Sequence, residues 1–395
     1  MDSSVQHLIS GLYLDMKTWR GGNATELYPP WMNPHVVSRG QQFALEHVTG
    51  VVLSAFYGLT MLFAFPQISD ILIFTENSDT RPRAGRLYAA TMLQVFLWMR
   101  RGFQMYPAWT LKSLLNVHLI HGRVAENVAA ALAQGTFRHR VESIVQNGKI
   151  NSGLWAAFQT DLDQSGIPQI MRIIPKELQR GNHVHVPMNQ FVHAMTQWAF
   201  FAVLATNPEK TLVFNSKREG LLDFVHLWAV LGHAMGLEDD FNIALLPHTQ
   251  YPRRFQLERM QSYLSEIKST YFIPMLFNLQ KENKILMEAF IQATSDILGN
   301  PEFLTDPEFL LRGILRDVVG IPIPNLEARR RFRPVSSYSL DWLVQVGSRL
   351  PHILFSNWNK IFSPFAARTH FQIGFKYFGL LYSSDESIAK YCFVT

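Results

Sequence analysis

The sequence predicts an all-α protein. In four long segments, apolar residues recur with the 3.6-residue period of an amphipathic helix. These segments are 86–101, 111–133, 189–204 and 217–235. Thr110 stands where an N-cap is expected, and Gly135 and Gly236 stand where helices should end. We expect two more helical stretches over 255–298 and a shorter one over 307–318, because no segment alternates as a strand would.

The chain divides into three regions. Residues 1–34 are predicted to form an irregular arm, residues 35–320 the main helical domain, and residues 321–395 a helical extension rich in aromatic and basic residues. From Trp342 to Ser384 there is no acidic residue. That composition suits either a surface lying on anionic lipid or an aromatic-rich helical cap on the domain.

The composition narrows the classes of partner. Hydrophobic residues make up 48% of the chain and charged residues only 17%, which indicates a large buried apolar cavity or contact with lipid. The net charge is +5, but no long basic run is present, which argues against nucleic acid as a partner. A single cysteine, Cys392, excludes a disulfide within the chain and a cysteine-based zinc site.

One segment is long and apolar enough to be considered as a membrane span. From His47 to Ser69 there is no Asp, Glu, Lys or Arg, and Val48 to Phe65 is long enough to be considered a membrane span. A buried core helix explains the same pattern. The N-terminus lacks the basic and apolar regions of a cleavable secretory signal, so we expect an intracellular protein, either free or associated with a membrane such as the endoplasmic reticulum.

The common catalytic motifs are absent. The sequence has no phosphate loop, no dinucleotide-binding glycine fingerprint, no nucleophile elbow, no zinc-protease His-Glu-x-x-His and no paired Glu-x-x-His. Fourteen histidines remain, several of them on apolar helices. Histidine is therefore the residue type on which a functional site is sought.

The strongest histidine pattern is His118-Leu-Ile-His121-Gly122. Leu114, His118, His121 and Ala125 follow helical spacing, so both imidazoles are predicted to share an inward stripe. A neutral imidazole on a rigid helix suits the axial position of a haem iron, and Gly122 leaves room for a flat macrocycle to approach the backbone. A pair of satisfied core histidines is the other interpretation.

Two weaker patterns also contain histidine. Asp223, His226 and His233 fall on one helical face, where they either form a site or bond one another between packed helices. His183 and His185 precede a proline in an apparent loop and offer a weak chelating pair.

Four blocks of sequence, in order, resemble the latex-clearing protein (rubber oxygenase) and mpaB-type oxygenase family over roughly residues 35 to 320. The blocks are Arg39-Gly-Gln-Gln-Phe43, Arg86-Leu-Tyr-Ala-Ala-Thr91, Val117-His-Leu-Ile-His-Gly-Arg-Val124, and Val186-Pro-Met-Asn-Gln190 with Leu227-Trp-Ala-Val-Leu-Gly-His-Ala-Met-Gly236. The resemblance implies a globin-like helical core that binds haem b, with His121 as the iron ligand. It places His118, Gly122 and Arg123 in the cofactor-binding segment.

The same resemblance implies the catalytic residues. Thr91 and Arg86 would lie on the distal face of the haem, and Glu76 is the nearest match to an upstream acidic residue that assists proton removal. Ala90 occupies the position at which latex-clearing proteins carry a lysine. The implied reaction is haem-dependent insertion of dioxygen across a C=C bond of an apolar, isoprenoid- or lipid-like substrate.

Two other functions stay open. Ala90 suggests a non-catalytic haem or lipid carrier or a gas sensor, and the acid-free tail suggests a structural protein on a lipid surface that has lost the cofactor. Cys392 also stands in a Cys-a-a-X pattern, Cys392-Phe-Val-Thr395, which indicates a prenylation site.

Overall fold

The computed structural model describes residues 3–16, 27–99, 107–179, 186–214, 216–245, 255–297 and 308–330. Within these ranges the regular elements are helices, and the only β feature is an isolated bridge between Asp15 and Asn189. The prediction of an all-α protein is therefore confirmed. The α-helices are α1 (Ser3–His7), α2 (Pro34–Glu46), α3 (Val48–Leu62), α4 (Pro66–Phe74), α5 (Arg81–Met99), α7 (Pro107–Ala133), α8 (Thr136–Asn147), α9 (Ser152–Asp163), α10 (Gln190–Thr206), α11 (Arg218–Ala234), α13 (Gln256–Ile267), α14 (Ile273–Phe277), α15 (Lys281–Ile297), α16 (Glu308–Gly313) and α17 (Pro324–Arg330).

Shorter turns of helix complete the list. The 3₁₀ turns are η1 (Leu8–Tyr13), η3 (Gln169–Arg172), η4 (Lys176–Leu178), η5 (Pro208–Thr211) and η6 (Asp239–Phe241). Two segments have π-helical hydrogen bonding, η8 (Lys268–Phe272), between α13 and α14, and η10 (Ile314–Val319), after α16.

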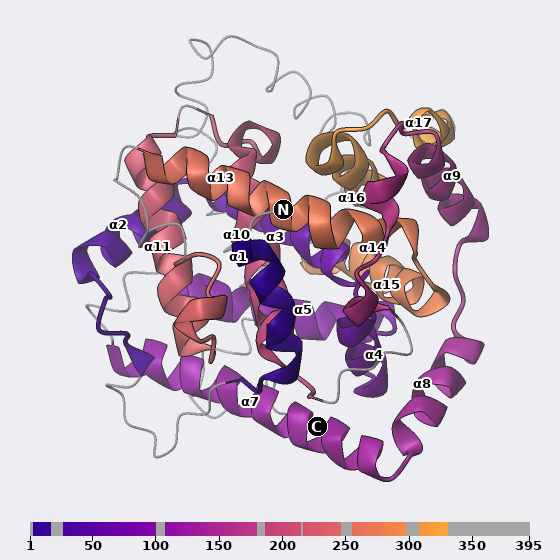
Figure 1. The fold of residues 1–395 in the computed structure, drawn as a ribbon, viewed down its shortest axis with the longest axis horizontal. Coiled ribbons are helices and arrows are strands. Elements are labelled where there is room, and N and C mark those ends of the chain that lie inside the picture. The colour runs from indigo at the N-terminus through magenta and orange to yellow at the C-terminus, as the bar shows by residue number, and fades with distance from the viewer. Residues whose placement is uncertain are drawn as a thin grey trace.

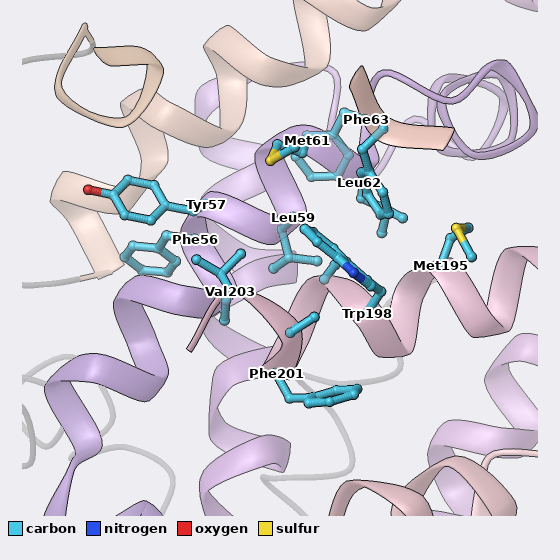
Figure 2. Packing of buried hydrophobic residues seen from close by; sticks show 14 of the residues in the cluster. Phe56, Tyr57, Leu59, Met61, Leu62, Phe63, Met195, Trp198, Phe201 and Val203 are labelled. Carbon is cyan, nitrogen blue, oxygen red and sulfur yellow. The ribbon is translucent and has the colours of Figure 1, made fainter. Parts of the chain in front are cut away.

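Helices α3 and α10 form the centre of the molecule and pack closely along their length (Figure 1). Gly58 of α3 lies directly against the backbone of Ala199 in α10, where any added Cβ atom would collide with the Ala199 carbonyl. Figure 2 shows the side chains of Leu59 and Trp198 lying between the two helices, and Trp198 is only 1% exposed. A glycine at the crossing lets the two backbones approach, and the aromatic side chains on either side fill the remaining space.

The apolar segment 47–69 was compatible with a membrane span or with a buried core helix, and the position of α3 bears on this choice. Apart from Thr49, every residue of α3 is buried inside the protein, so the core-helix interpretation describes its setting. None of the described helices is by itself both long and apolar enough to cross a membrane. The pair α2 and α3, which meet at an angle of 88°, passes that length and composition test only when taken together.

Two further helix pairs surround this centre. Gly40 of α2 lies against the backbone of Asp223 in α11, so these helices also cross closely. Helix α5 packs against α15, with Tyr88 edge-on to Phe290 at 4.6 Å between ring centroids. Helices α7 and α8 lie along the outer edge of the molecule in Figure 1.

The N-terminal residues differ from the irregular arm that the sequence predicts. Residues 3–13 are helical, and Val5, Leu8 and Leu12 are completely buried. The hydroxyl of Tyr271 donates a hydrogen bond of 2.5 Å to the carbonyl of Val5. The spacing of these three apolar side chains places them on one face, and burying that face against α10 and α13 outweighs the low helix-forming tendency of so short a segment.

Most helix boundaries agree with the capping signals. Asn189 accepts a hydrogen bond from the Val192 amide and begins α10, and Gly135 ends α7 with a φ of 69°. Helix α7 begins at Pro107, one turn before the predicted N-cap Thr110, because proline is favoured in the first turn of a helix. The predicted chelating pair His183 and His185, the acid-free segment Trp342–Ser384 and the prenylation site at Cys392 lie outside the described residues.

Candidate functional site: a cluster of buried histidines

The predicted histidine stripe is present on α7. Leu114 and His118 are buried, while His121 and Ala125 are half-buried farther along the same helix. The imidazole of His118 forms a hydrogen bond to the backbone of Met235 at the end of α11. Helix α7 thus points both imidazoles toward the interior, as the periodicity predicts.

The structure adds a third histidine, His193 on the first turns of α10. Its ring lies edge-on to that of His121, with 5.5 Å between the ring centroids and 71° between the planes. Nδ1 of His121 and Nε2 of His193 are both enclosed and have no hydrogen-bond partner. Nδ1 of His118 is enclosed and unpartnered as well. Three imidazoles with unused nitrogens therefore meet where α7 passes the start of α10.

All three imidazoles are held in the neutral form. Burial, together with the nearby His118, lowers the pKa of His121 to about 4. Burial and the two neighbouring imidazoles lower the pKa of His193 to about 3. Burial also lowers the pKa of His118, although its hydrogen bond to Met235 opposes the shift. A neutral imidazole carries the lone pair that a metal ligand requires, so the protonation state of the cluster suits ligation at neutral pH.

Hydrogen bonds of the Gln190 side chain fix the backbone around the cluster. The side-chain amide of Gln190, the first residue of α10, donates to the carbonyls of Asp15 and Gly236, each at 3.0 Å. Its Oε1 accepts from the amide of Glu238, also at 3.0 Å. Gln190 thereby joins the N-terminal segment, the start of α10 and the end of α11, next to the Met235 backbone that holds His118. The Pro-x-Asn-Gln block is thus a junction that positions the histidines.

The surroundings of His121 offer space and apolar surface. A Cβ atom added to Gly122 would meet nothing within 4 Å, so the backbone beside His121 is open. Val117 and Val124, one turn before and one turn after His121 on α7, are partly buried apolar side chains, and Leu87, Phe96, Leu111 and Leu115 are partly buried elsewhere on α5 and α7. These features fit a haem next to His121, because such a group needs one neutral axial imidazole, an open backbone and apolar walls.

The cluster can be compared with the donor sets that a bare metal ion and a haem require. Among the residues that the structure describes, no three or more His, Cys, Asp or Glu side chains are arranged to hold a metal ion by themselves. An axial haem ligand is a single imidazole, since the porphyrin supplies the other four nitrogens. His121, with its half-buried side chain and the open backbone of Gly122 beside it, is the member of the cluster that meets this requirement.

Helices α5 and α7 are joined at one end. The indole of Trp98 donates a hydrogen bond of 2.8 Å to Ser113, whose hydroxyl in turn donates to Gln94. From this junction α7 continues toward His121 and α5 runs back toward Thr91. The predicted proximal and distal residues are therefore carried by two helices with a fixed common end.

The predicted distal residues do not converge in this structure. Thr91 is half-buried, and its hydroxyl donates a 3.0 Å hydrogen bond to the carbonyl of Leu87 in its own helix. Arg86 is exposed and, five residues earlier, points about 140° away around the helix axis. Arg123 is exposed on α7 directly after Gly122. The two arginines thus lie at the surface, where they suit carboxylates better than a buried oxygen molecule.

Glu76 is engaged elsewhere. Its carboxylate accepts a 2.9 Å hydrogen bond from Arg140 of α8 and lies 3.4 Å from Arg83 of α5. Thr91 lies about 12 Å farther along the α5 axis than Arg83. The structure therefore places Glu76 in an ion-pair cluster between α5 and α8 and does not bring it beside Thr91.

The second predicted histidine pattern proves to be a set of contacts between helices. Asp223 is paired with Arg39 of α2, and Nε2 of His226 accepts from the Asn33 amide at 3.3 Å. Nδ1 of His233 lies 3.4 Å from the carboxylate of Asp239. Each of the three side chains has a polar neighbour on another segment, which agrees with the structural interpretation of this pattern.

A pocket of about 430 Å³ opens between the start of α5, the end of α8 and α15. Its lining includes the charged side chains of Arg81, Lys149 and Glu288 and none of the three clustered histidines. Such a lining does not match an apolar substrate, so we do not assign the site to this pocket.

His193 is the member of the cluster that sequence reasoning missed. It is a lone imidazole within an otherwise mostly apolar helix, and that isolation is the signal by which it stands out. No protein-family model and no curated protein matches the chain. The resemblance to the rubber oxygenase and mpaB-type family accordingly stays an expectation.

Proposed function

We propose that the chain is a haem-dependent oxygenase that acts on an apolar, unsaturated substrate, with His121 as the axial ligand of the iron. The observation that carries the proposal is the pair of neutral, enclosed imidazoles of His121 and His193 beside the open backbone of Gly122. Leaving buried polar nitrogens without partners costs about 1–3 kcal/mol each. The other ring nitrogen of His121, Nε2, is the atom that would bind the iron.

Each part of the chain has a role in this proposal. His121 would hold the iron, and the open backbone at Gly122 would leave room for the group. Exposed Arg123 lies where it can pair with a propionate at the surface. The half-buried apolar side chains of α5 and α7 bind an isoprenoid- or lipid-like chain and exclude water from it. A ferrous haem supplies dioxygen chemistry, in which both oxygen atoms add across one carbon–carbon double bond to give two carbonyl products.

Thr91 and Arg86 would act on the distal side only after rearrangement. The Thr91 hydroxyl has to leave the Leu87 carbonyl before it can donate to a bound oxygen molecule, and Arg86 has to turn inward.

The arrangement of the predicted distal residues favours a second candidate, a haem protein that binds gas or an apolar ligand without converting it to a product. With Thr91 satisfied by its own helix, Arg86 exposed and alanine at position 90, few polar groups are ready to activate oxygen. The polarity and the hydrogen-bond donors on the distal side of a haem decide between oxygen binding and oxygen activation.

The test is an absorption spectrum of the purified full-length protein with added hemin. We expect a Soret band in the wild type and its loss in His121→Ala, whereas His118→Ala keeps it, because the backbone of Met235 already bonds His118. A wild-type protein that takes up no hemin, or a His121→Ala variant with an unchanged spectrum, would contradict the proposal.

A second measurement separates the two candidates. The reduced, haem-loaded protein is mixed with oxygen and a set of unsaturated isoprenoids and lipids, and carbonyl products are sought by mass spectrometry. Two carbonyl fragments from one alkene support the oxygenase. Reversible oxygen uptake without products supports the binding protein.

A further inference from the structure

The unpartnered nitrogens of His121 and His193 complement each other. A neutral imidazole has one N–H donor and one acceptor nitrogen. One unpartnered, enclosed nitrogen belongs to each ring, Nδ1 in His121 and Nε2 in His193. A single N–H···N hydrogen bond between these two atoms would satisfy both.

The spacing of the rings allows this bond. Their centroids are 5.5 Å apart, and a ring nitrogen lies about 1.15 Å from its centroid, so two nitrogens turned toward each other would be about 3.2 Å apart, within hydrogen-bond range. An N–H···N bond leaves the two ring planes free to twist about its axis, so the 71° between the planes is compatible with it. Small rotations about the Cβ–Cγ bonds are sufficient, because that torsion is broad for histidine.

We infer that His193 is a positioning residue, which accepts a hydrogen bond from Nδ1–H of His121 and thereby fixes the tautomer and orientation of His121. With its proton on Nδ1, His121 presents the Nε2 lone pair to a ligand. Metal-binding histidines generally donate their other ring N–H to such an acceptor. The inference rests on the proposed function for its purpose, but the pairing itself is a property of the cofactor-free protein.

The helices around the pair make His193 a rigid acceptor. It lies in the first turns of α10, three residues after Gln190, whose amide ties that turn to the N-terminal segment and to the end of α11. His193 is 6% exposed, and the third imidazole, His118, is held separately by the Met235 backbone. His118 is therefore the matched control, a buried histidine of the same cluster that does not share the His121–His193 ring contact.

Two variants separate positioning from packing. His193→Gln keeps an acceptor oxygen of suitable reach, whereas His193→Leu keeps apolar volume and removes the acceptor. Full-length protein labelled with ¹⁵N at histidine reports the tautomer of His121 without any cofactor. We expect one tautomer, protonated at Nδ1, in the wild type, in His193→Gln and in His118→Gln, and a mixture of tautomers in His193→Leu.

Hemin titration gives the second measurement. Loss of a hydrogen-bond partner behind a metal ligand typically weakens affinity about 10- to 100-fold, so His193→Leu should bind hemin that much more weakly, and His193→Gln should recover most of the affinity. The helical circular dichroism of each variant is measured first, and His193→Met, which also lacks a strong acceptor, replaces the Leu variant if that variant is poorly folded.

The outcomes distinguish the two proposals. If the wild type binds no hemin but His193→Leu changes the His121 tautomer, the proposed function fails and the pairing stands. If hemin binds through His121 but tautomer and affinity are the same in the wild type and His193→Leu, the positioning role of His193 is overturned and the proposed function stands.

Discussion

The guanidinium of Arg39 makes two hydrogen bonds to the carboxylate of Asp223, at 2.5 and 3.0 Å, and so ties α2 to α11. The side chain of Asp223 is only 3% exposed, while that of Arg39 is 51% exposed. The pair lies at the point where Gly40 lets the two backbones come together. The pair contributes to stability mainly because it gives the buried carboxylate a partner, since a half-exposed arginine by itself stabilises the protein little.

Removing Arg39 should destabilise the protein. Arg39→Met keeps the apolar stem but leaves a buried carboxylate without its partner, which we expect to cost about 2 kcal/mol after allowance for the exposure of the arginine. Urea unfolding followed by circular dichroism measures the change. Arg218→Ala, which breaks the exposed pair with Glu258, is the control and should leave the unfolding midpoint nearly unchanged. Equal losses in the two variants would contradict this account.

Two glycines on helices should respond in opposite ways to alanine. Gly58→Ala forces α3 away from Ala199 and should lower the free energy of unfolding by about 2–3 kcal/mol. Gly122→Ala enters open space and should raise that free energy by up to about 1 kcal/mol, since alanine favours the helix. Thermal unfolding of the cofactor-free variants gives both values. In the haem-bound protein, Gly122→Leu should weaken hemin binding about tenfold or more, since 1.4 kcal/mol of steric cost has that effect.

His226 should make the protein sensitive to acid. Burial lowers its pKa below the ordinary value of 6.5, although Asp223 opposes the shift. Because the folded state has the lower pKa, this contribution to stability is complete above pH 6.5 and is lost as the pH falls toward the folded pKa. Protonation also removes the acceptor for the Asn33 amide that begins α2.

The groups near His226 also affect its pKa, so the variant that tests its role changes His226 alone. Asp223, which raises the pKa of His226, is itself paired with Arg39, and the His226 ring contacts Trp31, which bonds Asp239. We expect the melting temperature to fall less between pH 7.5 and 5 in His226→Gln than in the wild type. Identical pH profiles would show that His226 carries none of the acid sensitivity.

Gln190 should contribute more to the free energy of unfolding than an ordinary surface amide does. Gln190→Leu leaves the carbonyls of Asp15 and Gly236 and the amide of Glu238 without their partners, for an expected loss of about 2–3 kcal/mol. Gln42→Leu, at an exposed position of α2, is the control and should change stability by less than about 0.5 kcal/mol. Denaturant unfolding measures both. Limited proteolysis near Asp15 should also increase in Gln190→Leu, because that variant releases the N-terminal segment.

The sequence by itself determined the helices and several of their ends. Apolar residues at helical spacing gave α5, α7, α10 and α11, and Asn189, Gly135 and Gly236 stand at their ends because capping depends on neighbouring residues alone. Helices α8 and α9 were not singled out, although Asn151 caps the latter by accepting from the Leu154 amide. The divergence of Arg86 and Thr91 could also have been foreseen, since a five-residue spacing places them on different faces of a helix.

Only the tertiary structure decided which distant residues meet. The apolar segment 47–69 fits a core or a membrane equally well by composition, and its contact with α10 places it in the core. Glu76 could not be recognised as a partner of Arg140, nor His193 as the neighbour of His121, because each pair is formed by helices that are far apart along the chain. Local periodicity fixes which face of a helix is apolar, but the packing of those faces fixes which polar side chains are enclosed together.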